Sequence, residues 1–251
     1  MSRIEPAHSL LMRHLLFIPL LFSAHASAQT KHDPFDFKMA SVIILQSKEV
    51  QKELGISEAQ RTQMNKYADK HRGELVAYQK QLEARQKDKN KPLDVDPTKM
   101  DGMFVNLKKG VFGQLKPGQL KRLREISLQQ LGLVALIDET VATRVGLSVP
   151  EQKKIKSVYE SGIKEADQIA QAGQAQLEIQ LNELRKKYPN PKTDAEKEKV
   201  MSEAQKKAEA IEKRIDPQIE SVRKVTLTKM LSMLSAKQRG NWTTLLGKPF
   251  K

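Results

Sequence analysis

Cysteine is absent from this chain, and aromatic residues make up only 5% of it, with a single tryptophan. Without cysteine there is no disulfide framework, no thiolate metal site and no cysteine nucleophile. The hydrophobic fraction of 39% is lean for the core of a compact enzyme. What the chain has instead is charge, at 29% of residues, and a bias toward Ala, Glu, Lys, Gln, Arg and Leu. This composition predicts an all-α fold of long amphipathic helices.

The first 28 residues have the pattern of an export signal. Arg13 and His14 precede an apolar run at 15–22, and small residues follow up to Ala28. We expect cleavage after Ala28, with translation starting at Met1 or Met12. Eight apolar residues are too few for a membrane anchor, which needs roughly 20. The expected location is therefore the periplasm or the exterior of a cell.

The exported chain is strongly basic. Removing 1–28 takes two of the 44 basic and one of the 30 acidic residues, which leaves 42 minus 29, or +13. For an exported protein this charge favours unfolded or envelope proteins, anionic lipid or polysaccharide as partners, and it disfavours nucleic acid.

The rest of the chain is organised as two similar helical repeats, predicted at 29–137 and 138–251. In the first, an apolar stretch at 40–54 ends at Gly55, Ser57 opens a helix, and a second helix returns from Pro97. In the second, the arms surround a turn at 189–191, each with some 40 residues and about 60 Å long. Pro217 predicts a kink or a break in the returning arm.

A short motif occurs four times and supports a tandem duplication. Each copy has an apolar residue, a capping residue and a glutamine or glutamate. From Ile56 to Leu115 is 59 residues and from Leu147 to Leu234 is 87, so the second hairpin is longer by 28, or four heptads, as in coiled-coil-like arms. The motif residues are Ile56, Ser57 and Gln60; Leu115 and Gln119; Leu147, Ser148, Glu151 and Gln152; and Leu234, Ser235 and Gln238.

These motifs are typical of capping boxes, in which a serine and a residue three positions later satisfy each other's backbone N–H groups. The preceding leucine or isoleucine would pack against the first turn of the helix and fix the angle at the corner. A direct role of the glutamines in function stays open as the alternative.

The chain has no recognisable catalytic, cofactor or metal site. His32 and His71 are the only histidines after residue 28, and they are not at a metal-ligand spacing. Neither a phosphate-binding loop nor a nucleophile elbow is present. We therefore expect no cofactor and no enzyme activity.

Basic residues gather at both predicted hairpin tips and at one helix start. The dipole at a helix C-terminus explains part of the clusters at the tips, whereas cations at a helix start are better explained by an anionic partner. The candidate basic surface comprises Lys116, Lys121, Arg122, Arg124, Arg185, Lys186 and Lys187.

The motif Ile56-Ser57-Glu58-Ala59-Gln60, and again Leu234-Ser235-Ala236-Lys237-Gln238, resembles the Leu-Thr-x-x-Gln repeat of the Spy/CpxP family of periplasmic chaperones and stress-response modulators. Serine or lysine replaces the threonine in every copy. Family members carry two motifs and form a basic, cradle-shaped dimer, so a chain with four copies is expected to be a monomeric pseudo-dimer or a homodimer. The resemblance implies ATP-independent holding of unfolded envelope proteins. A regulatory or structural protein with one dedicated envelope partner, or one that binds an anionic envelope polymer, is the alternative.

Overall fold

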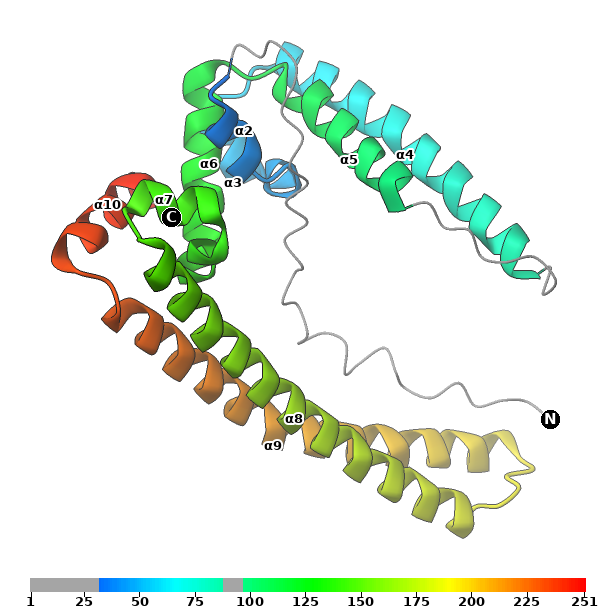
Figure 1. The fold of residues 1–251 in the computed structure, drawn as a ribbon. Helices are drawn as coiled ribbons and strands as arrows, with labels where there is room; N and C mark the ends of the chain where they lie inside the picture. Colours follow the sequence, from blue (N-terminus) through cyan, green and yellow to red (C-terminus); the bar gives the residue numbers. More distant parts are fainter. Residues whose placement is uncertain (1–31, 88–96) are drawn as a thin grey trace. The chain divides into compact units, whose positions relative to one another are not determined.

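The computed structural model describes residues 32–87 and 97–251, and in these residues all regular structure is helical (Figure 1). The predicted all-α fold is confirmed. The predicted export signal at 1–28 lies outside the described residues. None of the described helices combines the length and the apolar character that crossing a membrane requires.

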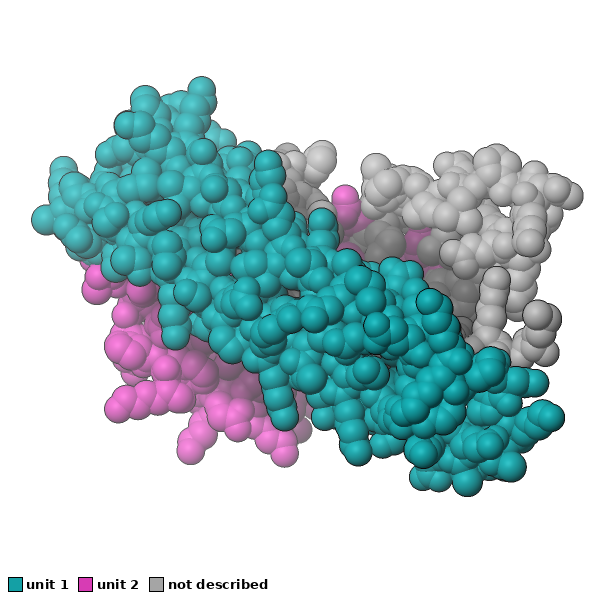
Figure 2. All heavy atoms as spheres, turned by 90° about the horizontal axis from the view of Figure 1, so that it is seen from below, with its two compact units in different colours: residues 1–20, 133–240 teal, residues 21–132, 241–251 magenta. Residues whose placement is uncertain are grey.

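The chain divides into two compact units, which Figure 2 shows in different colours. Of the described residues, the first unit along the chain, which is magenta and labelled unit 2 in Figure 2, contains 32–87, 97–132 and 241–251. The second, which is teal and labelled unit 1, contains 133–240. The units differ from the predicted repeats mainly in the segment 241–251, which groups with the first half of the chain.

The first unit begins with three short elements, α2 (Pro34–Met39), the 3-10 helix η1 (Ile43–Gln46) and α3 (Lys48–Glu53). The side chain of Asp33 accepts from the N–H of Phe35, and Ser47 caps α3 by accepting from Val50. The apolar stretch 40–54 is thus two elements, because the Ser47 backbone is extended, with φ −71° and ψ 129°.

The unit continues with α4 (Glu58–Lys87), α5 (Pro97–Phe112) and α6 (Pro117–Leu131), and α4 packs against α5. Gly110 permits this contact, since a Cβ there would lie 2.4 Å from the ring of Tyr67. Where the two helices meet α3 and α6, their apolar side chains form one core. Its buried members are Ala40, Leu45, Val50, Leu54, Ile56, Met64, Val111, Phe112, Leu115, Leu120, Leu123 and Ile126.

The second unit contains the 3-10 helix η2 (Gly132–Ile137), α7 (Glu139–Val145) and the long pair α8 (Val149–Lys187) and α9 (Asp194–Ser232). Asp138 caps α7 by accepting from the N–H groups of Thr140 and Val141. Each long helix has 39 residues, about 58 Å at 1.5 Å per residue. The two pack along their length, with Leu177, Ala208, Ile211 and Ile215 buried between them.

Small residues bring α8 and α9 close together. A Cβ on Gly162 would lie 2.2 Å from the hydroxyl oxygen of Thr226, and one on Gly173 would lie 3.1 Å from Ile215. Pro217 does not break α9, which is continuous from Asp194 to Ser232. The helix bends along its course instead, as Figure 1 shows.

The last helix, α10 (Ala236–Leu246), ends at Gly247. All four positive-φ residues found in the described chain are helix-ending glycines, namely Gly55, Gly132, Gly146 and Gly247. A left-handed backbone carries no Cβ penalty at glycine, which explains its use at each end.

Candidate functional site

The first two motifs lie together at the base of the α4–α5 pair. Gln60 and Ser57 form the predicted capping box: Ser57 N–H donates to Gln60 Oε1 at 3.0 Å, and Gln60 N–H donates to Ser57 Oγ at 3.2 Å. The Gln60 amide then reaches across the corner, donating to Gln119 Oε1 at 2.8 Å and to the carbonyl of Gln114 at 2.7 Å.

Gln119 likewise bonds both to the start of its own helix and to another segment of the chain. Its Oε1 accepts from the N–H of Lys116. This bond caps the start of α6, although Lys116 lacks the side-chain hydroxyl with which a serine completes a capping box. Its Nε2 donates to the carbonyls of Leu54 and Gly55 at 3.0 and 3.2 Å. Each glutamine therefore caps its own helix and binds the end of another segment.

The other two motifs form a similar corner at the base of the α8–α9 pair. Gln238 caps α10 with Ser235 and donates to the carbonyl of Gly146 at 3.1 Å and to Glu151 at 3.2 Å. Glu151 accepts from both the N–H and the hydroxyl of Ser148. These bonds, first of all the one from the Ser148 hydroxyl, lower the pKa of Glu151. Gln152 is separate and donates to the carbonyl of Leu147.

The apolar residue of every motif is buried, as the predicted packing at the corners requires. The exposed fractions are 8% for Ile56, 4% for Leu115, 5% for Leu147 and 2% for Leu234. The motif residues thus connect helices. Their geometry supports a structural role.

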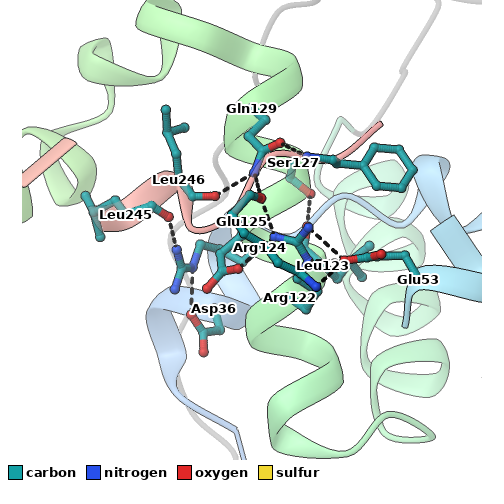
Figure 3. Close-up of polar contacts among 12 residues, drawn as sticks. Asp36, Glu53, Arg122, Leu123, Arg124, Glu125, Ser127, Gln129, Leu245 and Leu246 are labelled. Atoms are coloured by element: carbon teal, nitrogen blue, oxygen red, sulfur yellow. Dashed lines mark hydrogen bonds and ion pairs between the residues drawn. The ribbon is translucent and has the colours of Figure 1, made fainter. Parts of the chain in front are cut away.

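Arg124 is not part of an exposed basic surface. It is 5% exposed, its Nε lies 2.9 Å from a carboxylate oxygen of Asp36, and its guanidinium lies over the ring of Phe35. A second N–H group donates to the carbonyl of Leu245 (Figure 3). Arg124 therefore holds α2 and the end of α10 against α6.

Arg122 is likewise turned inward. Its side chain is 13% exposed and lies 2.8 Å from Glu53 and 3.0 Å from Glu125 (Figure 3). It also donates to the carbonyl of Lys248 at 2.8 Å. The prediction that these two arginines face an anionic partner is wrong, because both are turned inward and paired with Asp36, Glu53 and Glu125 of the chain itself.

Gln129 completes this polar face of α6, which sequence reasoning missed. Its Nε2 donates to the carbonyl of Leu246 at 2.6 Å (Figure 3). The same Nε2 donates to the carbonyl of Lys248 at 2.8 Å, and Oε1 accepts from the N–H of Phe250 at 2.8 Å. We call Arg122, Arg124 and Gln129 the α6 clamp.

The remaining candidate cations are exposed. Lys116, Lys121 and Lys186 have no ion pair with any described residue. Arg185 donates to Asn182, and Lys187 lies 3.2 Å from Glu203. That contact raises the pKa of Lys187. At the tip of the α8–α9 pair, Lys186 is thus the candidate cation with the fewest contacts to described residues.

The surface of the α4–α5 pair combines free cations with exposed apolar side chains. Every acidic side chain described on α4 is near a positive or protonatable partner: Glu58 with Arg61, Asp69 with Arg72, and Glu74 with His71. The exposed lysines without an ion pair in the described residues are Lys66, Lys70, Lys80 and Lys109. The exposed apolar residues are Tyr67, Val76 and Phe104, at 38, 46 and 46%.

Lys108, which sequence reasoning also missed, lies inside the base of this pair. Its Nζ donates to the carbonyl of Lys38 at 2.8 Å and lies 5.6 and 5.5 Å from the ring centroids of Phe37 and Phe112. Burial, with a smaller effect from the charge of Lys38, lowers its pKa to about 8.

The described residues contain no group of three or more His, Asp or Glu side chains that could hold a metal ion. His71 is 6% exposed, and its Nδ1 lies 2.8 Å from Glu74. It belongs to the face of α4 that packs inward.

A scan against protein-family models found no match, and the searches of curated proteins and of solved structures found none either.

Proposed function

We propose that this protein is an exported, ATP-independent chaperone-like protein that binds unfolded or aggregation-prone envelope proteins. The observation that carries the proposal is the surface of the α4–α5 pair, where lysines without an ion pair in the described chain lie on the same two helices as exposed Tyr67, Val76 and Phe104. Cations attract an anionic chain over a distance, and apolar side chains then add short-range contact.

Weak contacts of this kind suit a protein that holds a client and releases it without nucleotide. A client that folds buries its own apolar residues and so loses its affinity for the surface by mass action. The resemblance of the motifs to the Spy/CpxP family supports the same function. Four motif copies in two corners fit a monomer that does the work of a two-motif dimer.

The alternative is a regulatory or structural protein that binds one dedicated envelope partner or an anionic envelope polymer. The exposed Lys116, Lys121 and Lys186 suit a polyanion. Salt separates this alternative from the chaperone, since ionic attachment weakens when the Debye length falls from about 10 Å at 0.1 M to about 3 Å at 1 M salt, whereas apolar contact persists.

The test is suppression of aggregation of several unrelated unfolding proteins by residues 29–251, without ATP and at low and high salt. We expect protection at near-stoichiometric ratios with a component that survives high salt. Protection of no client would refute the proposal, and protection lost entirely at high salt would favour the polyanion-binding alternative.

Matched variants locate the surface. Phe104→Ser with Val76→Ser should reduce protection at both salt concentrations, and Lys66→Gln with Lys70→Gln should reduce it mainly at low salt. Ile179→Ser is the control, because Ile179 is also exposed, at 60%, but lies on α8. An equal loss in the control would show that the α4–α5 surface has no special role.

A further inference from the structure

Residues 247–251 follow the last helix and lie on the α6 clamp. Gly247, with φ +64°, turns the chain after Leu246. Arg122 and Gln129 both donate to the carbonyl of Lys248, and Gln129 accepts from the N–H of Phe250. The ring of Phe250 packs against the core of the first unit.

These polar contacts reach only main-chain atoms of the segment. Hydrogen bonds to main-chain carbonyl and N–H groups do not depend on which side chains the bound segment carries. Sequence preference is then confined to two places, the apolar site that Phe250 occupies and the contact of Lys248 Nζ with Glu53 at 3.7 Å. A different extended chain could make the same main-chain bonds.

Residues 247–251 also have the features of a segment that can detach from α6. It is not helical, and Lys248, Pro249 and Lys251 are exposed. Exposed segments with few buried contacts open at a low free-energy cost compared with the core. Release would free the contacts of Gln129 with Lys248 and Phe250, one contact of Arg122 and the apolar site of Phe250, while the bond from Gln129 to Leu246 stays.

We propose that this face of α6 is a peptide-binding site, occupied by the chain's own residues 247–251, that accepts an extended segment of an unfolded polypeptide with an aromatic residue in the place of Phe250. The inference rests on the proposed chaperone function for the identity of the client. The segment 247–251 then acts as an internal competitor that keeps the apolar site covered until a client displaces it.

The direct test measures binding of a fluorescein-labelled peptide with the sequence of residues 245–251 by fluorescence anisotropy. The protein is a variant that lacks 247–251, compared with the full chain. A tethered segment competes at an effective concentration in the millimolar range, so the full chain should bind the peptide at least about tenfold more weakly than the deletion variant. A peptide with alanine in place of Phe250 should bind the deletion variant much more weakly.

Three further variants keep the test decisive. Gly247→Ala in the full chain should loosen the segment without deleting it, since its Cβ would lie 2.2 Å from the Glu125 carboxylate, and it should raise peptide affinity. Gly240→Ala is the matched control, because a Cβ there meets nothing within 4 Å. Gln129→Ala in the deletion variant should remove most of the binding.

Circular dichroism establishes that each variant is folded. If the folded deletion variant and Gly247→Ala both fail to bind the peptide, or if the full chain binds it equally well, the peptide-binding site is refuted. The aggregation assay is a separate measurement, so chaperone activity without peptide binding would refute only this site. Peptide binding without protection of any client would refute only the proposed function.

Discussion

Gln60 and Gln119, which are 59 positions apart, bind each other at 2.8 Å while each also caps its own helix. This arrangement joins the starts of α4 and α6 through two side chains of one type. A similar arrangement joins α10 to the start of α8 through Gln238 and Glu151. The repeated motif is therefore a connector between helices as well as a cap.

Gln119→Ala should lower the free energy of unfolding by about 1–2 kcal/mol, because the carbonyls of Leu54 and Gly55 and the N–H of Lys116 lose their partner. Chemical denaturation measures this change. In a double-mutant cycle with Gln60→Ala the losses should not add, with a coupling of about 1 kcal/mol. Gln63→Ala, on an exposed position of α4, should have almost no effect. Additive losses would show that the two amides act independently.

Gly162→Ala should destabilise the α8–α9 pair by about 1–3 kcal/mol, since the new methyl group would overlap Thr226. Thermal melting followed by circular dichroism measures the loss. Adding Thr226→Ala should restore much of it by making room for the methyl group. Gly102→Ala is the control, because it lies in α5 with nothing within 4 Å and alanine favours a helix. A melting temperature unchanged by Gly162→Ala would contradict the close packing.

Arg124→Met should cost about 3 kcal/mol of stability, because it leaves the Asp36 carboxylate without its ion pair in a poorly exposed position. Asp36→Asn in the same chain should recover part of this loss. Arg72→Met, which removes the exposed 3.5 Å contact with Asp69, should change stability by at most about 0.5 kcal/mol. Similar losses for both arginines would mean that burial of the Arg124 pair has no energetic consequence.

Lys108 should make stability rise with pH above about 8. Its pKa is about 8 in the folded protein against 10.5 in the unfolded chain. Between these values the unfolded state binds more protons, so the gain from pH 7 to pH 11 amounts to about 2–3 kcal/mol.

The measurement is urea denaturation of the wild type and of Lys108→Met at several pH values. The wild type should gain stability relative to the variant as pH rises through this window. Because the rings of Phe37 and Phe112 favour the ammonium, they offset part of the burial cost at pH 7. A constant difference between the two proteins would contradict the shifted pKa.

Much of the fold could be predicted because it depends on local rules. Ser57 and Pro97 indicated helix starts, and Gly55 indicated a helix end, since caps and left-handed glycines act within a few residues. The same rules treated 40–54 as one apolar stretch, whereas Ser47 divides it and starts a new helix. They also predicted a kink or a break at Pro217. The helix α9 is not broken there but bends along its course (Figure 1), because a long packed helix tolerates the loss of one hydrogen bond.

The candidate site could be predicted only in part. The motif residues were identified as caps, but the contact between glutamines of different motifs was not, because nothing local specifies a partner 59 positions away. The arginines of α6 were assigned to a surface because their acidic partners, Asp36 and Glu53, come from segments 88 and 69 positions earlier. Lys108 gave no signal at all in the sequence.

The sequence by itself determined the helices, their caps and the places where they end, since these follow from hydrogen bonds and backbone preferences within one or two turns. Tertiary structure alone decided which polar side chains face inward, which cations remain free, and that residues 247–251 lie on α6. These properties depend on packing between distant segments, where the cost of leaving a charge or a carbonyl unpaired selects one partner among many.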